Sequence, residues 1–97
     1  MINAKFPLGN LVQTRGVASR RMTNPKFDEH VRKSLARYID ADWGDLDPDD
    51  KALNDEALDV GNRILAAYTS AEYPDFKIWI ITEWDRSVTT ILFPHEY

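Results

Sequence analysis

The chain has 97 residues, of which 43% are hydrophobic and 29% charged, with a formal net charge of −4 and no cysteine. This length leaves no room for a second domain, this apolar fraction argues against intrinsic disorder, and the lack of cysteine excludes disulfides, thiol nucleophiles and thiolate metal sites. The opening stretch MINAKFPLGN lacks the apolar run of a secretory signal, and no later run is long enough to span a bilayer. We therefore expect a single domain over residues 1–97, in the reducing cytoplasm and with no membrane partner.

Charge is unevenly distributed along the chain. Residues 1–37 contain eight lysines and arginines and two acids, a net charge of +6. Residues 38–97 contain four bases and fourteen acids, a net charge of −10. A basic first third thus precedes an acidic centre.

The first predicted elements are a short strand and a helix. Apolar residues after a Gly-Asn turn signal predict a strand over 11–14. Asn24 before Pro25 is typical of an N-cap followed by proline at the first helical position, so a helix should begin at Pro25. Its apolar residues recur at the helical period: Phe27, Val31, Leu35 and Tyr38 or Ile39.

A second helix is predicted over 48–60. Asp47 and Pro48 repeat the start signal, and Gly61 can end the helix in the left-handed conformation. We expect this helix to turn Leu53, Ala57 and Val60 toward the core. In the acidic loop that precedes it, the large ring of Trp43 is expected to plug the core.

The last third of the chain has the composition of β-strands. RILAAYTS (63–70), FKIWIIT (76–82) and SVTTILF (87–93) are rich in β-branched and aromatic residues and are separated by turn signals. The middle segment is apolar on both faces, which favours a central position. We expect an α+β fold with a small antiparallel sheet of three to four strands, the fourth being the N-terminal strand, and two helices packed on one face.

Four polar residues separate the last two predicted strands: Glu83, Asp85, Arg86 and Ser87. They could act as acid, base, cation and nucleophile in a small enzyme, because loops often carry catalytic groups. However, the only histidines are His30 and His95, so no local base is available to take the proton of the serine. Asp and Ser also favour turns for conformational reasons, and this interpretation is preferred.

The acidic stretch from Asp45 to Glu56 partly matches a calcium-binding loop. Asp45, Asp47, Asp49 and Glu56 occupy loop positions 1, 3, 5 and 12, but Asp50 stands where the loop needs glycine. A proline that opens a helix also carries the glutamate away from the ion instead of over it. An acidic helix start is therefore preferred, with no metal or other cofactor.

Nine carboxylates with a single lysine among them lie between residues 40 and 59: Asp40, Asp42, Asp45, Asp47, Asp49, Asp50, Asp55, Glu56 and Asp59. Such a run is commonly a solvated face. It can also place carboxylates roughly where a nucleic acid places phosphates, and so compete for a basic nucleic-acid-binding groove.

Direct nucleic-acid binding is a further alternative, through basic residues of the first third: Arg15, Arg20, Arg21, Lys26, Arg32 and Lys33. A sequence pI near 5.0 argues against it, because the acidic part of the chain repels phosphate. His30 lacks neighbours with the spacing of metal ligands, apart from two adjacent acids, and is expected at the helix surface.

Several stretches resemble a family of small bacterial proteins labelled plasmid-related. They are LGNLVQTRGV (8–17), DWGDLDPDDKALNDEAL (42–58), GNRILAAY (61–68) and KIWIITEWDRSVTTILFPHEY (77–97). The resemblance covers most of the chain and implies carriage on plasmids or other bacterial mobile elements. It implies no activity and no catalytic residue. By analogy, accessory proteins of this size on mobile elements often inhibit host defence, including restriction and CRISPR systems.

We therefore expect a non-enzymatic accessory protein that binds another protein, most plausibly a host defence or other nucleic-acid-binding protein. The predicted contacts are Asp40, Asp42, Asp45, Asp47, Asp49 and Asp50, with Asp85 and Arg86 at the hairpin as secondary contacts. The identity of the partner and the oligomeric state stay open at this point.

Overall fold

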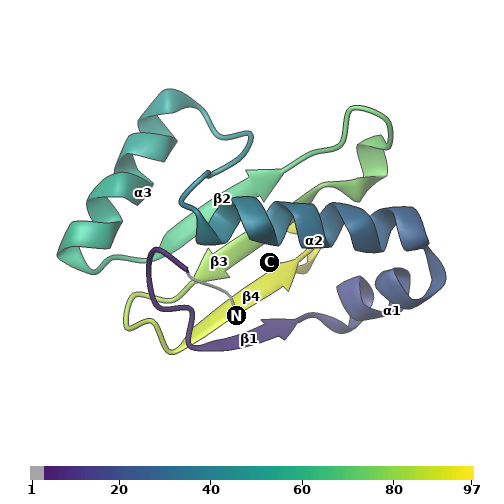
Figure 1. Cartoon of the computed structure of the whole chain (residues 1–97), viewed down its shortest axis with the longest axis horizontal. Coiled ribbons are helices and arrows are strands. Elements are labelled where there is room, and N and C mark those ends of the chain that lie inside the picture. Colours follow the sequence, from purple (N-terminus) through teal and green to yellow (C-terminus); the bar gives the residue numbers. More distant parts are fainter. Residues whose placement is uncertain (1–3) are drawn as a thin grey trace.

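A computed structural model describes residues 4–97; residues 1–3, which belong to the predicted domain and to the MINAKFPLGN stretch, lie outside the described residues. The elements are β1 (Asn10–Gln13), α1 (Arg15–Thr23), α2 (Pro25–Ile39), α3 (Pro48–Val60), β2 (Ile64–Tyr68), the short 3-10 helix η1 (Pro74–Phe76), β3 (Ile78–Thr82), β4 (Val88–Leu92) and the 3-10 helix η2 (Pro94–Glu96) (Figure 1). This is an α+β fold, as predicted. Within residues 4–97, none of the helices has the length and apolar character that a bilayer crossing requires.

The four strands form one sheet in the order β1-β4-β3-β2. β3 pairs antiparallel with both β2 and β4, so the predicted three-strand meander and the central position of β3 are confirmed. The N-terminal strand joins as the fourth, but it runs parallel to β4, with Asn10 opposite Val88. The sheet is therefore mixed instead of wholly antiparallel. β1 and its neighbour β4 are not joined by a hairpin turn, so no local turn sequence determines whether β1 runs parallel or antiparallel to β4.

α1 was not predicted. Its sequence RGVASRRMT buries only Val17 and has no apolar stripe, so the helical period cannot reveal it. It is held by caps: the side chain of Thr14 accepts a hydrogen bond from the backbone N–H of Val17. Asn24 ends α1, and its side-chain oxygen accepts from the N–H groups of Lys26 and Phe27, which begins α2 as predicted.

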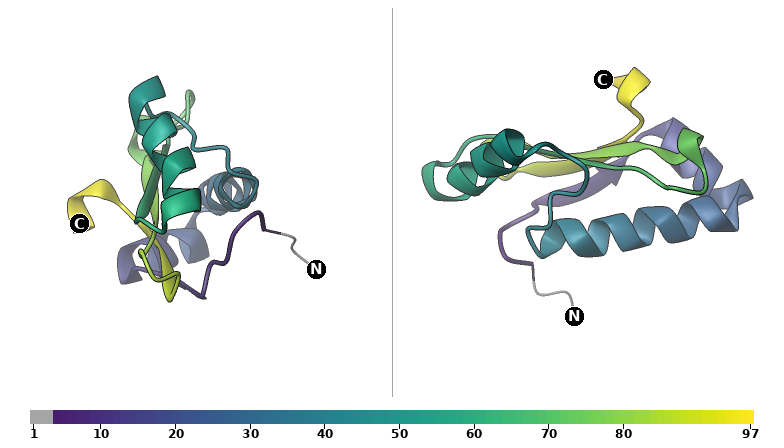
Figure 2. Two further views of the ribbon diagram at one scale, coloured as in Figure 1. Left: turned by 90° about the vertical axis from the view of Figure 1, so that its left-hand side faces the viewer. Right: turned by 90° about the horizontal axis from the view of Figure 1, so that it is seen from above.

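α2 covers one face of the sheet (Figure 2). The core on this face includes Phe27, Val31 and Tyr38 from the helix and Ile64, Ala66, Ile78, Ile80 and Ile91 from the strands. Trp43 plugs one end of this core, as expected, and is only 3% exposed. Its ring lies 5.6 Å from the ring of Tyr38 and 5.7 Å from that of Phe6, measured between centroids.

α3 lies beside the edge strand β2 and does not share the face that α2 covers (Figures 1 and 2). The expectation that both helices pack on one face is therefore wrong. Asn54 and Ala57 are its buried residues, while Leu53 is 61% and Val60 59% exposed, contrary to the predicted core face. The reason is that α3 packs against the edge of β2, where backbone N–H and C=O groups need hydrogen-bond partners. A polar side chain satisfies them, whereas leucine would suit an apolar sheet face.

Candidate functional site

The sheet face opposite α2 is apolar, and in the described chain the C-terminal segment lies on that side (Figure 2). Side chains alternate along a strand, so residues between those buried against α2 point to this second face. Two cross-strand rows form it, and we call it the open face: Leu65, Ile81 and Thr90 in one row, and Ala67, Trp79 and Leu92 in the other. Leu65, Trp79 and Thr90 are partly exposed, whereas the other three are buried.

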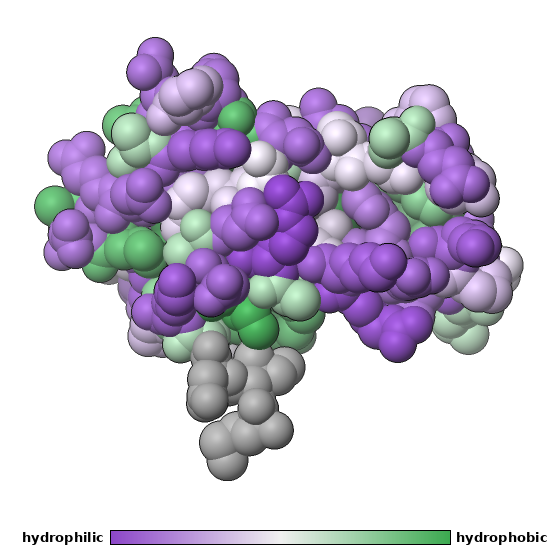
Figure 3. All heavy atoms as spheres, turned by 45° about the horizontal axis from the view of Figure 1, so that its top comes forward, coloured by the Kyte–Doolittle hydropathy of each residue, from purple (hydrophilic) through white to green (hydrophobic). Residues whose placement is uncertain are grey.

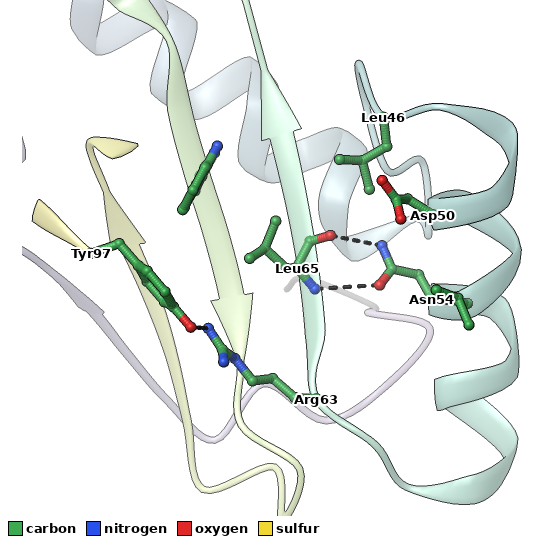
Figure 4. A pocket seen from close by; sticks show the side chains of 8 residues that line it. Leu46, Asp50, Asn54, Arg63, Leu65 and Tyr97 are labelled. Atoms are coloured by element: carbon green, nitrogen blue, oxygen red, sulfur yellow. Dashed lines mark hydrogen bonds between the residues drawn. The ribbon is translucent and has the colours of Figure 1, made fainter. Parts of the chain in front are cut away.

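A hollow of about 460 Å³ lies between α3 and the open face (Figure 4). Leu65 and Trp79 line it from the sheet, and Leu53 lines it from the helix. The polar side chains around it belong to Asp50, Asn54 and Arg63, and Leu46 and Tyr97 complete the lining. An apolar recess with few polar groups is the usual character of a recognition site.

Asn54 closes the wall between α3 and β2. Its amide nitrogen donates to the carbonyl oxygen of Leu65 at 2.8 Å, and its amide oxygen accepts from the N–H of Leu65 at 3.3 Å (Figure 4). The side chain thus bonds the free edge of β2 in the way that another strand would. Both the nitrogen and the oxygen of this amide are thus engaged by the fold.

Arg63 and Tyr97 form a pair at the rim of the hollow. The guanidinium of Arg63 donates to the hydroxyl of Tyr97 and lies 5.0 Å from the centre of its ring (Figure 4). The ring of Tyr97 in turn meets that of Trp79 edge-on, with centroids 5.5 Å apart. Tyr97 is 67% exposed, and within residues 4–97 Arg63 forms no ion pair with a carboxylate.

A second, smaller hollow of about 290 Å³ lies next to the first, and Arg63 and Tyr97 line both of them. Ile81, Thr90 and Leu92 line it from the sheet, and Glu83 and Glu96 add carboxylates. The carboxylate of Glu96 accepts from the hydroxyl of Thr14 and the N–H of Phe93, so it serves the fold. The two hollows together make the open face an uneven apolar surface with a mainly acidic rim.

Three predicted contact residues of the acidic segment are used inside the molecule. Asp42 binds Arg37 through both oxygens, at 2.8 and 3.2 Å, and this bond lowers the pKa of the carboxyl. Asp45 accepts from the N–H and the hydroxyl of Thr69, at 2.8 and 2.9 Å, which lowers its pKa too. Asp47 is the predicted N-cap of α3.

The remaining acids of this segment are more available. Within residues 4–97, Asp40 forms an exposed ion pair with Lys5, at 3.5 Å, and no other ion pair. Asp49, Asp50, Glu56 and Asp59 are exposed and form no ion pair within residues 4–97. One exposed stripe of α3, which we call the α3 stripe, therefore alternates acidic and apolar residues: Asp49, Leu53, Glu56 and Val60. Green apolar patches among purple hydrophilic atoms mark the α3 end of the molecule in Figure 3.

The hairpin residues make a turn, as preferred. The carboxylate of Asp85 accepts from the hydroxyl of Ser87 at 2.6 Å and from its N–H at 3.1 Å, and these bonds lower the pKa of Asp85. Arg86 points back to the end of α3, where it donates to the carbonyls of Ala57 and Asn62. The adjacent Trp84 is 68% exposed.

The calcium alternative finds no geometric support in the part of the chain that the structure describes. No group of three or more histidine and acidic side chains there could hold a metal ion. Asp47 caps α3 and Pro48 opens it, so the helix runs as the sequence indicated. His30 is half-buried, with Nε2 3.4 Å from the carbonyl oxygen of Tyr68, and burial lowers its pKa.

Much of the basic first third is neutralised by neighbours. Arg21 and Arg32 both bind Asp28, at 2.7 and 3.1 Å. Lys33 pairs with Glu29 at 2.9 Å. Arg20 lies over the ring of Phe93, with 4.9 Å from its guanidinium carbon to the ring centre, and contacts Asp75. These cations stabilise α1 and α2 more than they form a basic patch.

Comparison of the chain with protein-family models, with curated proteins and with solved structures gives no match.

Sequence reasoning missed most residues around the main hollow. Of its lining, only Asp50 was among the predicted contacts. Arg63, Trp79 and Tyr97 come from three separate segments, and only the sheet brings them together. One signal was present: the middle strand is apolar on both faces, and such a strand needs two covered faces. The structure covers one of them with α2 and the other only in part: Ala67, Ile81 and Leu92 are buried, whereas Leu65, Trp79 and Thr90 stay partly exposed.

Proposed function

We propose that the protein is a non-enzymatic binding module that engages another protein through the α3 stripe and the adjoining open face. The observation that carries this proposal is the α3 stripe itself, where exposed Leu53 and Val60 alternate with the carboxylates of Asp49 and Glu56. Exposed apolar side chains set among charges are typical of a surface that becomes buried on association. Trp84, 68% exposed, adds a large ring in the hairpin whose Arg86 bonds the C-terminal end of α3.

The proposed partner has a basic surface. α3 is held at both ends, by the N-cap Asp47 and by the bonds of Arg86 to the carbonyls of Ala57 and Asn62. Its carboxylates are therefore displayed at fixed spacing, which favours recognition of a patterned basic groove. A nucleic-acid-binding protein offers such a groove. The resemblance to plasmid-related proteins favours a role on a mobile element, with a host defence protein as the target.

A capture experiment with charge-reversed variants tests this function. The full chain is used as bait in a bacterial lysate, beside a variant with Asp49→Lys and Glu56→Lys. Both side chains are exposed and unpaired within residues 4–97. Asp49 lies in the first turn of α3, where the helix dipole favours an acid, so we expect a loss of about 1 kcal/mol in the free energy of unfolding, and the variant should stay folded. Asp45 is left intact because its loss would break the bonds to Thr69.

The control carries Glu72→Lys and Asp75→Lys, with the same change in charge in the β2–β3 connection at the other end of the molecule (Figure 1). Asp75→Lys also removes the exposed contact with Arg20, so the melting temperatures of the control and the α3 variant are measured side by side. Partners retained by the wild type and by this control should be lost from the α3 variant. Their retention should also weaken as salt is raised. Equal recovery of the same partners by all three baits would refute a docking role for the α3 stripe.

A further inference from the structure

Resting on the proposed protein-binding function, we propose that the hollow between α3 and the open face receives a partner segment in which an apolar side chain stands next to a lysine or arginine. The proposal thus names the place where the partner binds and the kind of side chains that bind there. It concerns Asp50 and Trp79, which lie outside the α3 stripe.

The apolar part of the ligand follows from the lining. Leu53, Leu65 and Trp79 present side chains to a recess of about 460 Å³, beside the largely exposed ring of Tyr97. Tryptophan, tyrosine and arginine are the residues most often responsible for binding energy at protein interfaces, and Trp79, Tyr97 and Arg63 meet here. An apolar side chain placed against them would remove both rings from water.

The basic part of the ligand follows from the charges. Four charged residues line the two hollows: Asp50, Arg63, Glu83 and Glu96. Asp50 and Arg63 line the main hollow, and Glu83 and Glu96 line the second one. Glu96 already accepts from Thr14 and Phe93, and the guanidinium of Arg63 lies against the ring of Tyr97. Asp50 and Glu83 form no ion pair within residues 4–97, so a partner cation would gain a carboxylate without breaking a bond. Aromatic ring faces also attract ammonium and guanidinium groups.

The same charges argue against a nucleic acid at this site. Aromatic side chains on an open sheet can stack on bases, but binding sites for single strands pair such rings with a positively charged groove. Here the main hollow has one carboxylate, Asp50, beside one cation, Arg63, and the second hollow adds Glu83 and Glu96, so no positively charged groove accompanies the rings. A basic protein segment satisfies both the rings and the carboxylates, whereas an oligonucleotide satisfies only the rings.

The test uses a short synthetic peptide of alternating lysine and leucine, titrated into the ¹⁵N-labelled full chain and followed by NMR. We expect the indole N–H of Trp79 and the side-chain amide of Asn54 to shift. Asp50→Asn should weaken binding about threefold to fivefold, the value of one exposed ion pair. Asp59→Asn, on the same helix but away from the lining, should leave the affinity unchanged. Analogues with leucine replaced by serine, or lysine by glutamate, should not bind.

Several results would overturn the inference. They are shifts confined to Asp49, Glu56 and Val60 of the α3 stripe, equal loss of affinity in Asp50→Asn and Asp59→Asn, or no binding of the peptide. A shift of the Trp79 indole caused by an oligothymidine would also overturn it, as would a shift caused by protein concentration alone, which would indicate a second copy. Failure here is distinct from failure of the proposed function, because the capture experiment changes Asp49 and Glu56, which do not line the hollow.

Discussion

Three buried hydroxyl groups form a directed chain through the core. The hydroxyl of Tyr38 lies 2.6 Å from that of Thr82, which lies 2.7 Å from that of Thr89, and Thr89 donates to the carbonyl of Leu8 at 2.8 Å. Because a carbonyl can only accept, Thr89 must accept from Thr82, and Thr82 must accept from Tyr38. The chain joins α2, β3, β4 and the segment before β1 through fully buried side chains.

Thr82→Val should therefore destabilise the protein strongly. The change keeps the shape of the side chain but leaves the hydroxyl of Tyr38 without an acceptor and that of Thr89 without a donor. We expect a loss of about 2–3 kcal/mol in the free energy of unfolding, measured by urea denaturation.

Thr90→Val is the matched control on the same hairpin. Thr90 is partly exposed on the open face and makes no side-chain hydrogen bond within residues 4–97, so a change within about 0.5 kcal/mol is expected. Similar losses in the two variants would contradict the chain of hydroxyl groups.

Among the elements, the loop before α3 seals the free edge of β2. Gly44 forms an isolated bridge to Ala67, and the N–H of Asp45 donates to the carbonyl of Ala67 at 2.7 Å. Asn54 bonds Leu65 further along the same strand. The acidic segment thus protects an edge that could otherwise pair with another chain. This structural role accounts for several carboxylates that the sequence alone would assign to a partner.

Two glycines allow this role to be measured. Gly44 and Gly61 have φ angles of +77° and +79°, but a Cβ at Gly44 would lie 2.1 Å from the carbonyl oxygen of Ala67, whereas a Cβ at Gly61 would have nothing within 4 Å. Gly61→Ala should cost about 1 kcal/mol, for backbone strain alone. Gly44→Ala should cost clearly more, about 3 kcal/mol or above, because the loop must leave β2.

Thermal denaturation of the two variants gives the comparison. A Gly44→Ala protein as stable as Gly61→Ala would show that the contact between the loop and β2 contributes little to the folded state.

Across the whole molecule, titratable groups favour neutral to mildly alkaline conditions. Bonds to Arg37 lower the pKa of Asp42, bonds to Thr69 lower that of Asp45, and burial lowers that of His30. Each of these groups stabilises the fold above its unfolded pKa and loses this contribution as the pH falls. Burial raises the pKa of Tyr38 and Tyr68, so their contribution is lost as the pH rises.

The melting temperature should therefore be highest from about pH 7 to 9, and fall below about pH 6.5 as His30 is protonated on unfolding. It should fall further below about pH 4, where the carboxylates titrate, and again above about pH 10, where the tyrosines ionise on unfolding. Asp45→Asn should flatten the acid limb, which is the fall in melting temperature below about pH 4. An unchanged acid limb in Asp45→Asn would contradict the role given to its bonds with Thr69.

The sequence by itself determined the local structure. The local signals are the caps at Asn24 and Asp47, the left-handed glycine after α3 and the β-branched residues of the strands. Each acts over a few residues, so it can be recognised from the sequence alone. The fold class, two of the three helices and the hairpins followed from them. Of the candidate site, only the acidic character of α3 and Asp50 followed.

The tertiary structure decided the rest. Contacts distant in sequence set the parallel direction of β1, the stability of α1, which has no apolar stripe, and the position of α3 at a strand edge. They also separated Asp45, which holds Thr69, from Asp49, which is free within residues 4–97, although both are aspartates of one acidic run. The physical reason is that burial and hydrogen bonding depend on which backbone and side-chain groups come into contact in the folded chain. The periodicity of residues along the sequence does not specify those contacts.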